Sequence, residues 1–441
     1  AMRAMLMVAM LLGSVGAAGG THIDFTWKVH DNYQKLDTVK IKDPPYDFML
    51  KDSKYFPINT GLPGLVAKVM VDPGKYGVEK LPRVVIVHMA NPLVSFPDRR
   101  AFLDAWGKFE FVTVISPWLS ETADYFADVV LPAATMEKYE GPIKADDPYV
   151  DAVTVRLPVG EPIYESRGEI DIYLSLAEAM GVLGGEKGYL ANINTRLALG
   201  AQALPLDVKP TAREVLDRWA RAQGIEEGLA YFEEHGVKVK GPRAPAKMYG
   251  YVTDPPFGGL IHRLYGESLL RYQEEMRAKG AEEIYWQDYT ALPVWREPTY
   301  TRTPPAYDLH LISYKVIENK QSRSSFNALL AELMPQQRLD INPATARRKG
   351  IGNGKWVQVE SRHALTGETR RVRVRAHYTE GIRPDTVGLP HGFGLWTHSV
   401  SRGMGPSANE LYFTGEGYVA NTADQAYLVM VRVTPASDGS E

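Results

Sequence analysis

The sequence predicts an α/β protein in which a parallel-sheet domain is followed by a mostly β domain. Between residues 84 and 131, short continuous apolar segments alternate with amphipathic helical segments. This alternation is typical of a parallel sheet with helical crossovers. After a stretch rich in Pro and Thr at residues 292–306, the pattern changes to short apolar strands separated by Gly and Asn turns. That second pattern favours a small barrel or sandwich.

In the first domain we expect three strands with two helices between them, namely strands 84–88, 111–116 and 128–131 and helices 99–108 and 120–126. Ser95 and Asp98 are predicted to cap the first helix, because a Ser hydroxyl can accept from a free helical N–H and Asp favours the positive helix end. Ligands of such sheets bind outside the carboxyl ends of the strands. The predicted binding edge therefore comprises residues 89–95, 116–121 and 132–137.

The remaining segments divide into a helical and a β region. Residues 138–250 are predicted to contain loops and helices, with helices at 169–180, 211–222 and 225–235. Strands of the C-terminal domain are expected at 309–316, 356–361, 370–375 and 426–433. The third of these strands carries Arg370, Arg371, Arg373 and Arg375. We interpret these arginines as a solvated strand edge that discourages pairing with other chains.

The composition excludes several classes of protein. In 441 residues, 50 Lys and Arg stand against 53 Asp and Glu, and this near-balance argues against a nucleic-acid-binding protein. The chain has no cysteine, which excludes disulfides, Cys nucleophiles and cysteine-ligated iron–sulfur clusters within it. His-Glu-x-x-His and Gly-x-Ser-x-Gly are both absent, so zinc hydrolase and serine hydrolase motifs are missing.

Two segments resemble known sequence motifs, a secretory signal peptide and a phosphate-binding loop. The apolar segment 5–12 follows Arg3 and precedes small residues up to Gly20, so the pattern fits either a secretory signal peptide or a buried helix. It is too short to span a bilayer, which takes about 20 residues. The Gly-rich segment 350–355 resembles a phosphate loop, but it follows a predicted helix and precedes a strand. A phosphate loop needs the reverse order, so we predict a turn.

Three polar loops of the β domain are candidate ligand contacts. They are residues 319–327, 391–394 and 421–424, each of which adjoins a predicted strand or Gly-rich turn. Any one of them could be ordinary loop chemistry. Together they favour the hypothesis that the loops converge on a polar ligand with many hydrogen-bonding groups.

Several ordered motifs resemble the molybdopterin oxidoreductase (dimethyl sulfoxide reductase) family. They are the Asn-Pro turn in 91–98, the segment 111–135 with its Ala-Asp-Val-Val-Leu-Pro strand, and the C-terminal segments 338–343, 350–357 and 380–387 with Asn421. The resemblance implies a Rossmann-like domain with a helical insertion at 81–291 and a linker at 292–306. It also implies a molybdopterin-dinucleotide-binding double-psi β-barrel at 307–434, with a disordered tail at 435–441. Segment 380–394 is most similar to the thiosulfate/polysulfide reductase branch.

The resemblance implies a cofactor and a set of residues that bind it. The cofactor would be molybdopterin guanine dinucleotide, in the bis form, with molybdenum or tungsten. The implied contacts are Asn91, Pro92, Ser116, Thr122 and Asp128 toward the nucleotide, Lys315, Ser322, Arg323, Ser324 and Asn327 toward phosphate or pterin, and His391 and Asn421 toward the pterin. Ser116 replaces an Asp common in the family, so its role stays open. No catalytic residue and no metal ligand is assigned to this chain.

The resemblance also implies partners. Family members begin with roughly another half, which carries the metal ligand and commonly an iron–sulfur segment. We therefore interpret residues 1–80 as an incomplete segment that continues from a missing N-terminal half or a companion chain, and segment 5–12 as an internal helix. An iron–sulfur electron-transfer subunit and a membrane-anchor subunit are further implied partners, and no nucleic acid is expected. The implied location is periplasmic or membrane-associated, with a cytoplasmic location left open.

Four functions stay open at this stage. The first is reduction of a sulfur compound such as thiosulfate or polysulfide. The second is an arsenate, nitrate or formate type of activity within the same family. The third is a non-catalytic pterin-binding or assembly subunit, and the fourth is an unrelated nucleotide-binding α/β protein. We also expect the chain by itself to self-associate, because its sheet edge and segment 5–12 would be uncovered.

Overall fold

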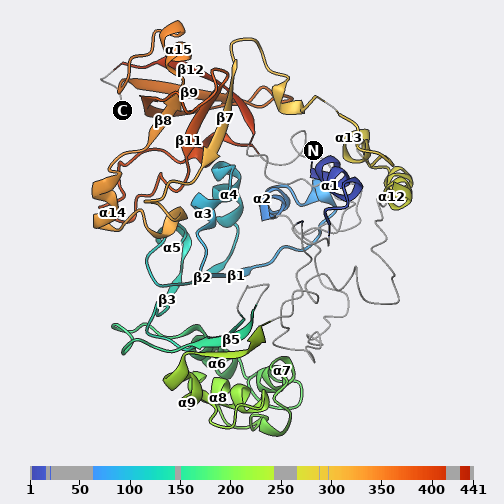
Figure 1. Cartoon of the computed structure of the whole chain (residues 1–441), viewed down its shortest axis with the longest axis vertical. Helices are drawn as coiled ribbons and strands as arrows, with labels where there is room; N and C mark the ends of the chain where they lie inside the picture. The colour runs from blue at the N-terminus through green and yellow to red at the C-terminus, as the bar shows by residue number, and fades with distance from the viewer. Residues whose placement is uncertain are drawn as a thin grey trace. The chain divides into compact units, whose positions relative to one another are not determined.

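A computed structural model describes residues 2–15, 20, 63–144, 150–242, 266–287, 289–295, 297–413 and 428–437. The chain divides into two compact units (Figure 1). One unit contains residues 131–264 together with the N-terminal 43 residues, and the other contains residues 44–130 and 265–441. We call them the insertion unit and the barrel unit, and we describe each by itself.

The barrel unit begins with the predicted strand–helix pattern. Strands β1 (Val84–His88), β2 (Phe111–Ser116) and β3 (Val129–Pro132) form one sheet in that order, and β1 and β2 are parallel. Helices α3 (Pro92–Ser95), α4 (Arg99–Trp106) and α5 (Glu121–Phe126) lie between the strands in sequence, and α2 (Pro63–Val71) precedes them. Met70 of α2 and Phe102 of α4 share a small hydrophobic core. The predicted parallel arrangement is confirmed for β1 and β2.

Helices α5 and α4 begin with different kinds of N-cap. Ser120 caps α5, because its Oγ accepts a hydrogen bond from the backbone N of Ala123 at 3.2 Å. The cap predicted at Ser95 is wrong. Ser95 ends α3, and the N-cap of α4 is Asp98, which has a φ of 65° and makes no side-chain cap bond. The Asp98 carboxylate instead forms an ion pair with Arg370 at 2.8 Å.

The C-terminal part of this unit is a closed six-stranded barrel (Figure 1). Its strands are β7 (Leu309–Tyr314), β8 (Arg338–Ile341), β9 (Trp356–Arg362), β10 (Thr369–Tyr378), β11 (Thr386–Pro390) and β12 (Val429–Pro435), in the order β10-β8-β11-β7-β12-β9. The pairs β10/β8 and β11/β7 are parallel, and the pairs β10/β9, β11/β8, β12/β7 and β12/β9 are antiparallel. The inward-facing residues, such as Leu311, Val359 and Val431, are fully buried. A mostly β domain is therefore confirmed.

The interpretation of the arginine-rich strand as a sheet edge is wrong. Strand β10 is hydrogen-bonded to β9 on one side and β8 on the other. Val372 and Val374 point into the barrel core, and Arg371, Arg373 and Arg375 alternate with them on the outside, as the two-residue period of a strand requires. Arg370 shares the face of the valines and forms the ion pair with Asp98. Arg373 and Arg375 each lie over the ring of Trp356, at 4.7 and 4.6 Å from its centroid.

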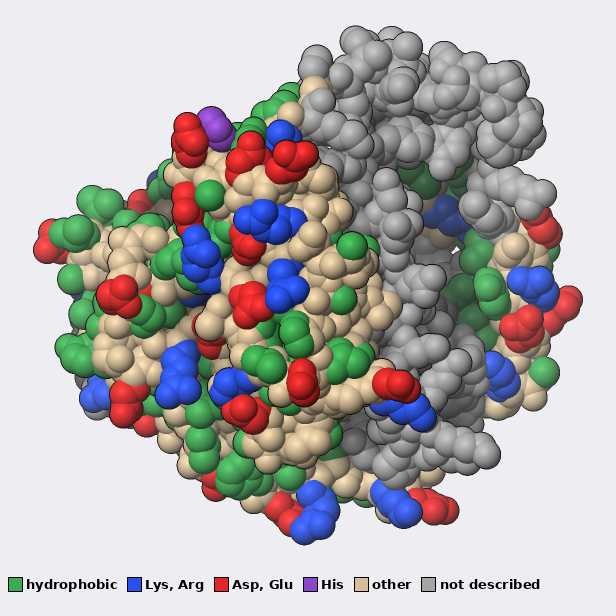
Figure 2. Space-filling model, turned by 90° about the horizontal axis from the view of Figure 1, so that it is seen from below, with side chains coloured by type: hydrophobic (Ala, Val, Ile, Leu, Met, Phe, Trp, Pro, Cys, Tyr) green, Lys and Arg blue, Asp and Glu red, His purple; other side chains and the backbone are tan. Residues whose placement is uncertain are grey.

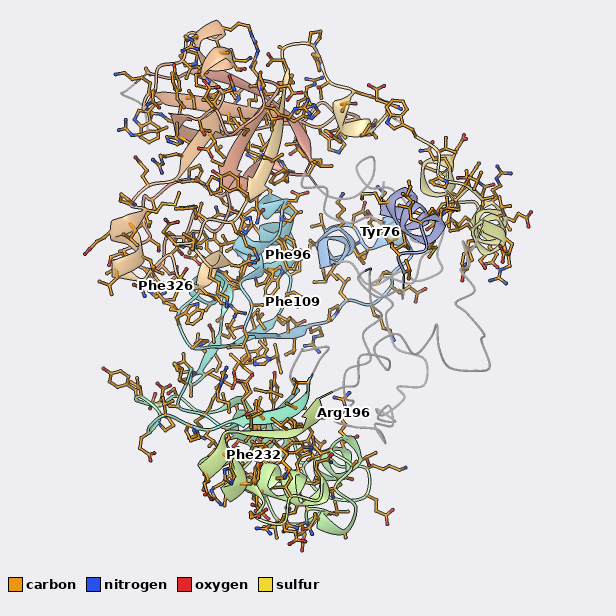
Figure 3. The ribbon with its side chains drawn as sticks, in the orientation of Figure 1. Tyr76, Phe96, Phe109, Arg196, Phe232 and Phe326 are labelled. Atoms are coloured by element: carbon orange, nitrogen blue, oxygen red, sulfur yellow. The ribbon has the colours of Figure 1, made fainter. Side chains whose placement is uncertain are left out.

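The insertion unit combines helices with a small antiparallel sheet. Its helices are α6 (Glu169–Ala179), α7 (Tyr189–Arg196), α8 (Ala212–Ala222) and α9 (Leu229–His235), and its strands are β4 (Glu140–Lys144), β5 (Val150–Arg156) and β6 (Val237–Pro242). The sheet was not predicted. Trp219 of α8 packs against Phe232 of α9, with ring centroids 6.1 Å apart. Phe232 is labelled in Figure 3. The predicted helices over 169–180 and 211–222 are confirmed, and α9 begins four residues later than expected.

The remaining described helices are short or isolated. They are α1 (Met2–Leu11), α12 (Gly266–Ala278), α13 (Glu283–Trp286), α14 (Ala328–Leu333), α15 (Pro343–Arg348) and the 3-10 turns Gly74–Tyr76, Gly200–Gln202, Thr299–Thr301, Gln321–Arg323 and Ala408–Leu411. Segment 5–12 is thus largely helical, with Met5 and Leu11 exposed. Within the described residues, no helix has the length and apolar character needed to cross a membrane. The predicted turn at 350–355 is confirmed, whereas the tail at 438–441 lies outside the described residues.

The charged side chains are mixed rather than segregated on the face shown in Figure 2, where acidic and basic groups alternate with hydrophobic ones. This distribution agrees with the near-balance of 50 basic and 53 acidic residues in the sequence.

The exposed edge strand β1 of the three-stranded sheet leads to a testable prediction about self-association. Val84 and Ile86 of β1 are 57% and 49% exposed, and β1 pairs with β2 alone among the described strands. Exposed apolar edge strands promote association between chains. We expect the full chain to self-associate and Ile86→Lys to raise its monomer fraction, measured by sedimentation velocity. Ile312→Lys is the matched control, because Ile312 is 40% exposed but lies on β7, which is paired on both sides. An equal effect of both variants would contradict the edge-strand explanation.

Candidate functional site

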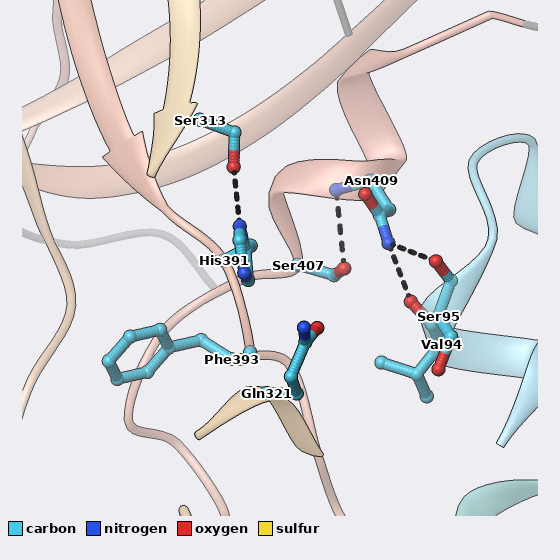
Figure 4. Close-up of a pocket in the computed structure, with 9 residues that line it drawn as sticks. Val94, Ser95, Ser313, Gln321, His391, Phe393, Ser407 and Asn409 are labelled. Atoms are coloured by element: carbon cyan, nitrogen blue, oxygen red, sulfur yellow. Dashed lines mark hydrogen bonds between the residues drawn. The ribbon is translucent and has the colours of Figure 1, made fainter. Parts of the chain in front are cut away.

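The barrel unit contains a pocket of about 350 Å³ (Figure 4). One wall comes from the end of α3, and the others come from loops at one end of the barrel. The pocket is lined by Val94, Ser95, Ser313, Gln321, His391, Gly392, Phe393, Ser407 and Asn409. The α/β segment and the barrel, which lie more than 200 residues apart in sequence, thus contribute to the same pocket.

His391 is the titratable group in the pocket wall. Its Nδ1 lies 3.2 Å from Oγ of Ser313 (Figure 4), and its backbone N donates to the carbonyl of Tyr314 at 3.1 Å. Burial lowers the pKa of His391, and the nearby charge of Lys315 lowers this pKa further. The ring is therefore neutral at pH 7, with one nitrogen as donor and the other as acceptor. The Ser313 hydroxyl can either donate a hydrogen bond to Nδ1 or accept one from it, so this contact is compatible with both tautomers of the His391 ring.

Two of the three predicted ligand loops meet at this pocket. Nδ2 of Asn319 donates to the carbonyl of Gly392 at 3.0 Å, which joins loop 319–327 to loop 391–394. The contact is close: a Cβ on Gly392, where φ is 92°, would lie 2.8 Å from Asn319 Nδ2 and 2.8 Å from the carbonyl oxygen of Gln321. Gln321 itself has a φ of 60°, which is uncommon for a residue with a side chain. The third loop, 421–424, lies outside the described residues.

Several buried polar atoms in this region have no hydrogen-bond partner among the described residues. They are Nε2 of His391, Oδ1 of Asn319 and Oε1 of Gln337. Asn319 is 4% exposed and Gln337 is fully buried. Gln337 donates through Nε2 to the carbonyl of Pro390, directly before His391. An unsatisfied buried polar atom costs about 1–3 kcal/mol, so these atoms suit a ligand that carries both donors and acceptors.

The α3 wall is fixed to the barrel by polar contacts. Nδ2 of Asn409 donates to the carbonyls of Val94 and Ser95 at 2.8 and 3.0 Å (Figure 4). Arg99 of α4 forms an ion pair with Glu410 at 3.1 Å and lies over the ring of Trp396, 4.4 Å from its centroid. The pocket thus forms within one packed unit.

Most predicted residues of the α/β segment lie together at the carboxyl ends of β1 and β2. Asn91 and Thr122 are buried and bonded to one another, since Asn91 Oδ1 accepts from Thr122 Oγ1 at 2.8 Å. Pro92 is buried in the first turn of α3, and Ser116 is buried at the end of β2. Asp128 does not join them. It accepts from the backbone N of Val112 at 2.8 Å, at the start of β2, about 13 Å from Ser116 at 3.3 Å per residue.

The predicted residues of loop 315–327 have mixed positions. Lys315 and Arg323 are exposed. Ser324 and Asn327 are engaged locally: Ser324 Oγ accepts from the backbone N of Lys320 at 2.6 Å, and Asn327 caps α14. The side chain of Ser322 and all of Asn421 lie outside the described residues. The cofactor contacts assigned to the twelve predicted residues stay predictions.

Sequence reasoning missed three residues that shape this region, and it gave no role to a fourth, Glu121, which ends the predicted edge segment 116–121. Ser313 and Asn409 line the pocket, Gln337 lies behind it, and Glu121 bonds Asn91 and the barrel loop at Trp396. The pairings of Glu121 and Asn409 span 275 and 315 residues of sequence, and no local pattern indicates them. Within the described residues, no group of three or more His, Asp or Glu side chains is arranged to hold a metal ion.

Comparison with known proteins supports this arrangement. Residues 309–421 match the model of the molydopterin dinucleotide binding domain. The chain is 24% identical to the thiosulfate reductase molybdopterin-containing subunit PhsA of Salmonella typhimurium, over 89% of this chain and 50% of that protein. It is 25% identical to a dimethyl sulfoxide/trimethylamine N-oxide reductase of Cereibacter sphaeroides, over 68% of this chain and 34% of that protein. Its fold resembles acetylene hydratase from Pelobacter acetylenicus, with a TM-score of 0.60 over 88% of this chain and 50% of that chain, at 15% identity.

The chain spans a third to a half of the length of these curated relatives. The domain match covers the barrel from β7 to the segment before β12, the same part that supplies His391, Ser407 and Asn409 to the pocket. The relatives align with most of the chain, including the α/β segment. The chain therefore carries a molydopterin dinucleotide binding domain in its C-terminal part and is similar, over most of its length, to the molybdopterin-containing subunit of a thiosulfate reductase.

Proposed function

We propose that the pocket between α3 and the barrel binds part of a molybdopterin guanine dinucleotide cofactor. The observation that carries this proposal is the unpartnered buried Nε2 of His391 in the pocket wall, next to the polar lining residues Ser313, Gln321 and Asn409. Pterin, ribose, guanine and phosphate all present hydrogen-bonding edges, and such atoms would complement them. The match of residues 309–421 to a dinucleotide-binding domain supports the same conclusion.

Each residue of the pocket would have a distinct task. His391, neutral and oriented by Ser313, would donate or accept one hydrogen bond through Nε2. Asn319, which lies behind the lining, would hold Gly392 in place through its Nδ2. Lys315, which is exposed beside the pocket, would add positive charge for phosphate. When bound, the molybdenum or tungsten cofactor supplies two-electron redox chemistry, and this chain would orient the cofactor and exclude water around it.

Titration calorimetry of the full chain with GDP tests the binding proposal. We expect saturable binding with a Kd below about 1 mM. His391→Ala should weaken binding about fivefold, because one hydrogen bond in the pocket is worth about 1 kcal/mol. His235→Ala is the matched control, since His235 is half-exposed on α9 of the insertion unit. Absence of saturable binding at millimolar GDP would contradict the proposal.

We further propose that the complete protein is a reductase of a sulfur compound such as thiosulfate or polysulfide. The thiosulfate reductase subunit aligns with 89% of this chain. The dimethyl sulfoxide/trimethylamine N-oxide reductase aligns with 68% of it, and the arsenate respiratory reductase subunit ArrA of Chrysiogenes arsenatis aligns with 71%. Arsenate reduction is the alternative within the family. The native complex should reduce thiosulfate or polysulfide with a viologen donor, and faster turnover of arsenate would favour the alternative.

A non-catalytic role is the second candidate. The chain is 24% identical, over 76% of its length, to the menaquinone reductase molybdopterin-binding-like subunit of Nitratidesulfovibrio vulgaris. In either role we propose the double-psi topology for the barrel, which its mixed parallel and antiparallel pairing supports. We also propose a companion chain or segment that holds the metal ligand, with electron-transfer and membrane subunits beside it. Pterin and metal analysis of the native complex distinguishes the roles, because a non-catalytic subunit would contain neither molybdenum nor tungsten.

A further inference from the structure

A single buried carboxylate joins the α/β segment to the pocket loop of the barrel. Glu121, in the first turn of α5, is 2% exposed. Its Oε1 accepts from the backbone N of Trp396 at 2.8 Å and from both the backbone N and Oγ1 of Thr397, at 3.1 and 2.8 Å. Its Oε2 accepts from Nδ2 of Asn91 at 2.7 Å. Four donors from two distant parts of the chain thus share one carboxylate.

The hydrogen bonds continue from Glu121 into α3. Oδ1 of Asn91 accepts from the backbone N and the Oγ1 of Thr122, at 3.1 and 2.8 Å. Thr122 Oγ1 in turn accepts from the backbone N of Leu93 at 3.1 Å. Asn91 and Thr122 are both buried. The start of α3, the start of α5 and the barrel loop at 396–397 are therefore linked by an unbroken series of hydrogen bonds, with Glu121 as the only carboxylate among these residues.

This series lies next to the pocket on both sides. On the α3 side it ends at Leu93, directly before the lining residues Val94 and Ser95. On the barrel side it holds Trp396 and Thr397, three residues after the lining residue Phe393. The other end of this loop is held by the bond from the His391 backbone N to Tyr314 and by Asn319. Loss of the Glu121 contacts would remove the hydrogen bonds to the backbone N of Trp396 and Thr397 and leave Trp396 with its contacts to Arg402 and Arg99.

We propose that Glu121 is a positioning residue for the cofactor, which sets the distance between the α3 wall and the His391–Phe393 wall of the pocket. Glu121 does not line the pocket, so it acts through the loop rather than by contact with the ligand. This inference rests on the proposed binding function. It assigns to the Glu121 carboxylate a role that neither the sequence motifs nor the domain match gives it.

The ionised carboxylate is the form that fits these four donors. Burial alone raises the pKa of Glu121, but the hydrogen bonds from Thr397, Trp396 and Asn91 outweigh that effect and hold its pKa below the ordinary value of 4.5. In Glu121→Gln the side chain keeps its size and loses one acceptor. Its NH2 group must then face either the backbone N–H groups of 396–397 or the NH2 group of Asn91.

The test combines binding with local hydrogen exchange in the full chain. We expect Glu121→Gln to weaken GDP binding at least tenfold at pH 7, and to accelerate amide exchange in the peptide covering residues 391–401. Circular dichroism should show a folded protein. Asp217→Asn is the matched control: Asp217 on α8 also accepts a backbone N–H, from Leu229 at 2.8 Å, and a side-chain N–H, from Arg221 at 2.9 Å, but all of these groups belong to the insertion unit. It should leave the affinity and the exchange unchanged.

The outcomes separate this inference from the proposed function. If the wild-type chain fails to bind GDP, the proposed function is overturned and the inference with it. If the wild type binds and Glu121→Gln binds equally well, the inference alone is overturned and Glu121 has only a structural role. Should Glu121→Gln not fold, Thr397→Val gives the answer, because it removes one donor to Oε1 and keeps the side-chain shape. For Thr397→Val we expect a severalfold loss of affinity, and unchanged affinity would contradict the proposal.

Discussion

Replacement of Gly394 with alanine is expected to lower the free energy of unfolding by more than about 3 kcal/mol, the upper end of the cost of local backbone strain. Gly394 has a φ of 82°, and a Cβ at this position would lie 2.5 Å from the backbone N of Ser407 and 2.9 Å from its Cα. These are backbone atoms, so no side-chain rotation relieves the clash. Because Ser407 lines the pocket, the shift should also abolish GDP binding.

Gly403→Ala is the control that separates the cost of backbone strain from the cost of the steric clash with Ser407. Gly403 lies in the same connection between β11 and β12, with a nearly identical φ of 79°, but its Cβ would have no neighbour within 4 Å. It should cost only the left-handed conformation of a non-glycine residue, about 1–2 kcal/mol. Urea unfolding of both variants, with GDP titration of those that fold, gives the comparison. Equal losses for the two variants would show that the Ser407 contact is unimportant.

The part of the fold that could be predicted from sequence is the part with strong local patterns. Strands β1 and β2 are continuous apolar segments, and both were predicted with their observed bounds. Strands β8 and β11 were missed, since β8 has four residues and β11 contains both Gly388 and Pro390. Strand β4 likewise contains Gly141 and Pro142. For β6 a signal existed, because Val237 and Val239 alternate with lysines directly after the predicted helix ends.

The site was less predictable than the fold, for a physical reason. Sequence patterns indicated polar loops near strand ends, and His391 and Asn319 do meet. They could not indicate which distant groups pair. The family resemblance assigns Asp128 to the nucleotide, yet its carboxylate accepts a hydrogen bond from the backbone at the start of β2. Asn409, which closes the pocket against α3, occurs in a segment without regular alternation. Only the tertiary structure brings these residues next to their partners.

A second large effect is expected at Glu360, on the outside of the barrel. Its side chain is 2% exposed and accepts from Tyr307 OH at 2.6 Å and from Nη2 of Arg432 at 2.7 Å, with Arg371 as a third partner. The three partners come from β12, β10 and the residues before β7, while Glu360 lies on β9. This carboxylate therefore joins four segments of the barrel unit at one point.

We expect Glu360→Gln to lower the free energy of unfolding by about 2–3 kcal/mol, the range for hydrogen bonds to charged groups. The larger loss of about 3–5 kcal/mol for a fully buried pair does not apply, because the side chains of Arg371 and Arg432 are 59% and 40% exposed and keep part of their hydration. Glu178→Gln is the control. Glu178 pairs with Lys209 at 2.5 Å, but both side chains are exposed, so the midpoint of urea unfolding should hardly change.

The same carboxylate predicts how stability depends on pH. Burial raises the pKa of Glu360, but the bonds from Tyr307 and Arg371 and the charges of Arg432 and Arg371 outweigh it and hold this pKa below the ordinary value of 4.5. The unfolded chain therefore takes up protons at a higher pH than the folded chain. The stabilisation of the folded state by the ionised Glu360 carboxylate is fully present above pH 4.5, and it is lost as the pH falls through the lower pKa of the folded state. Glu121, whose pKa is also lowered, adds to this loss. Glu360→Gln should consequently lose less stability than the wild type on acidification from pH 7, and parallel losses would show that Glu360 is not ionised in the folded barrel.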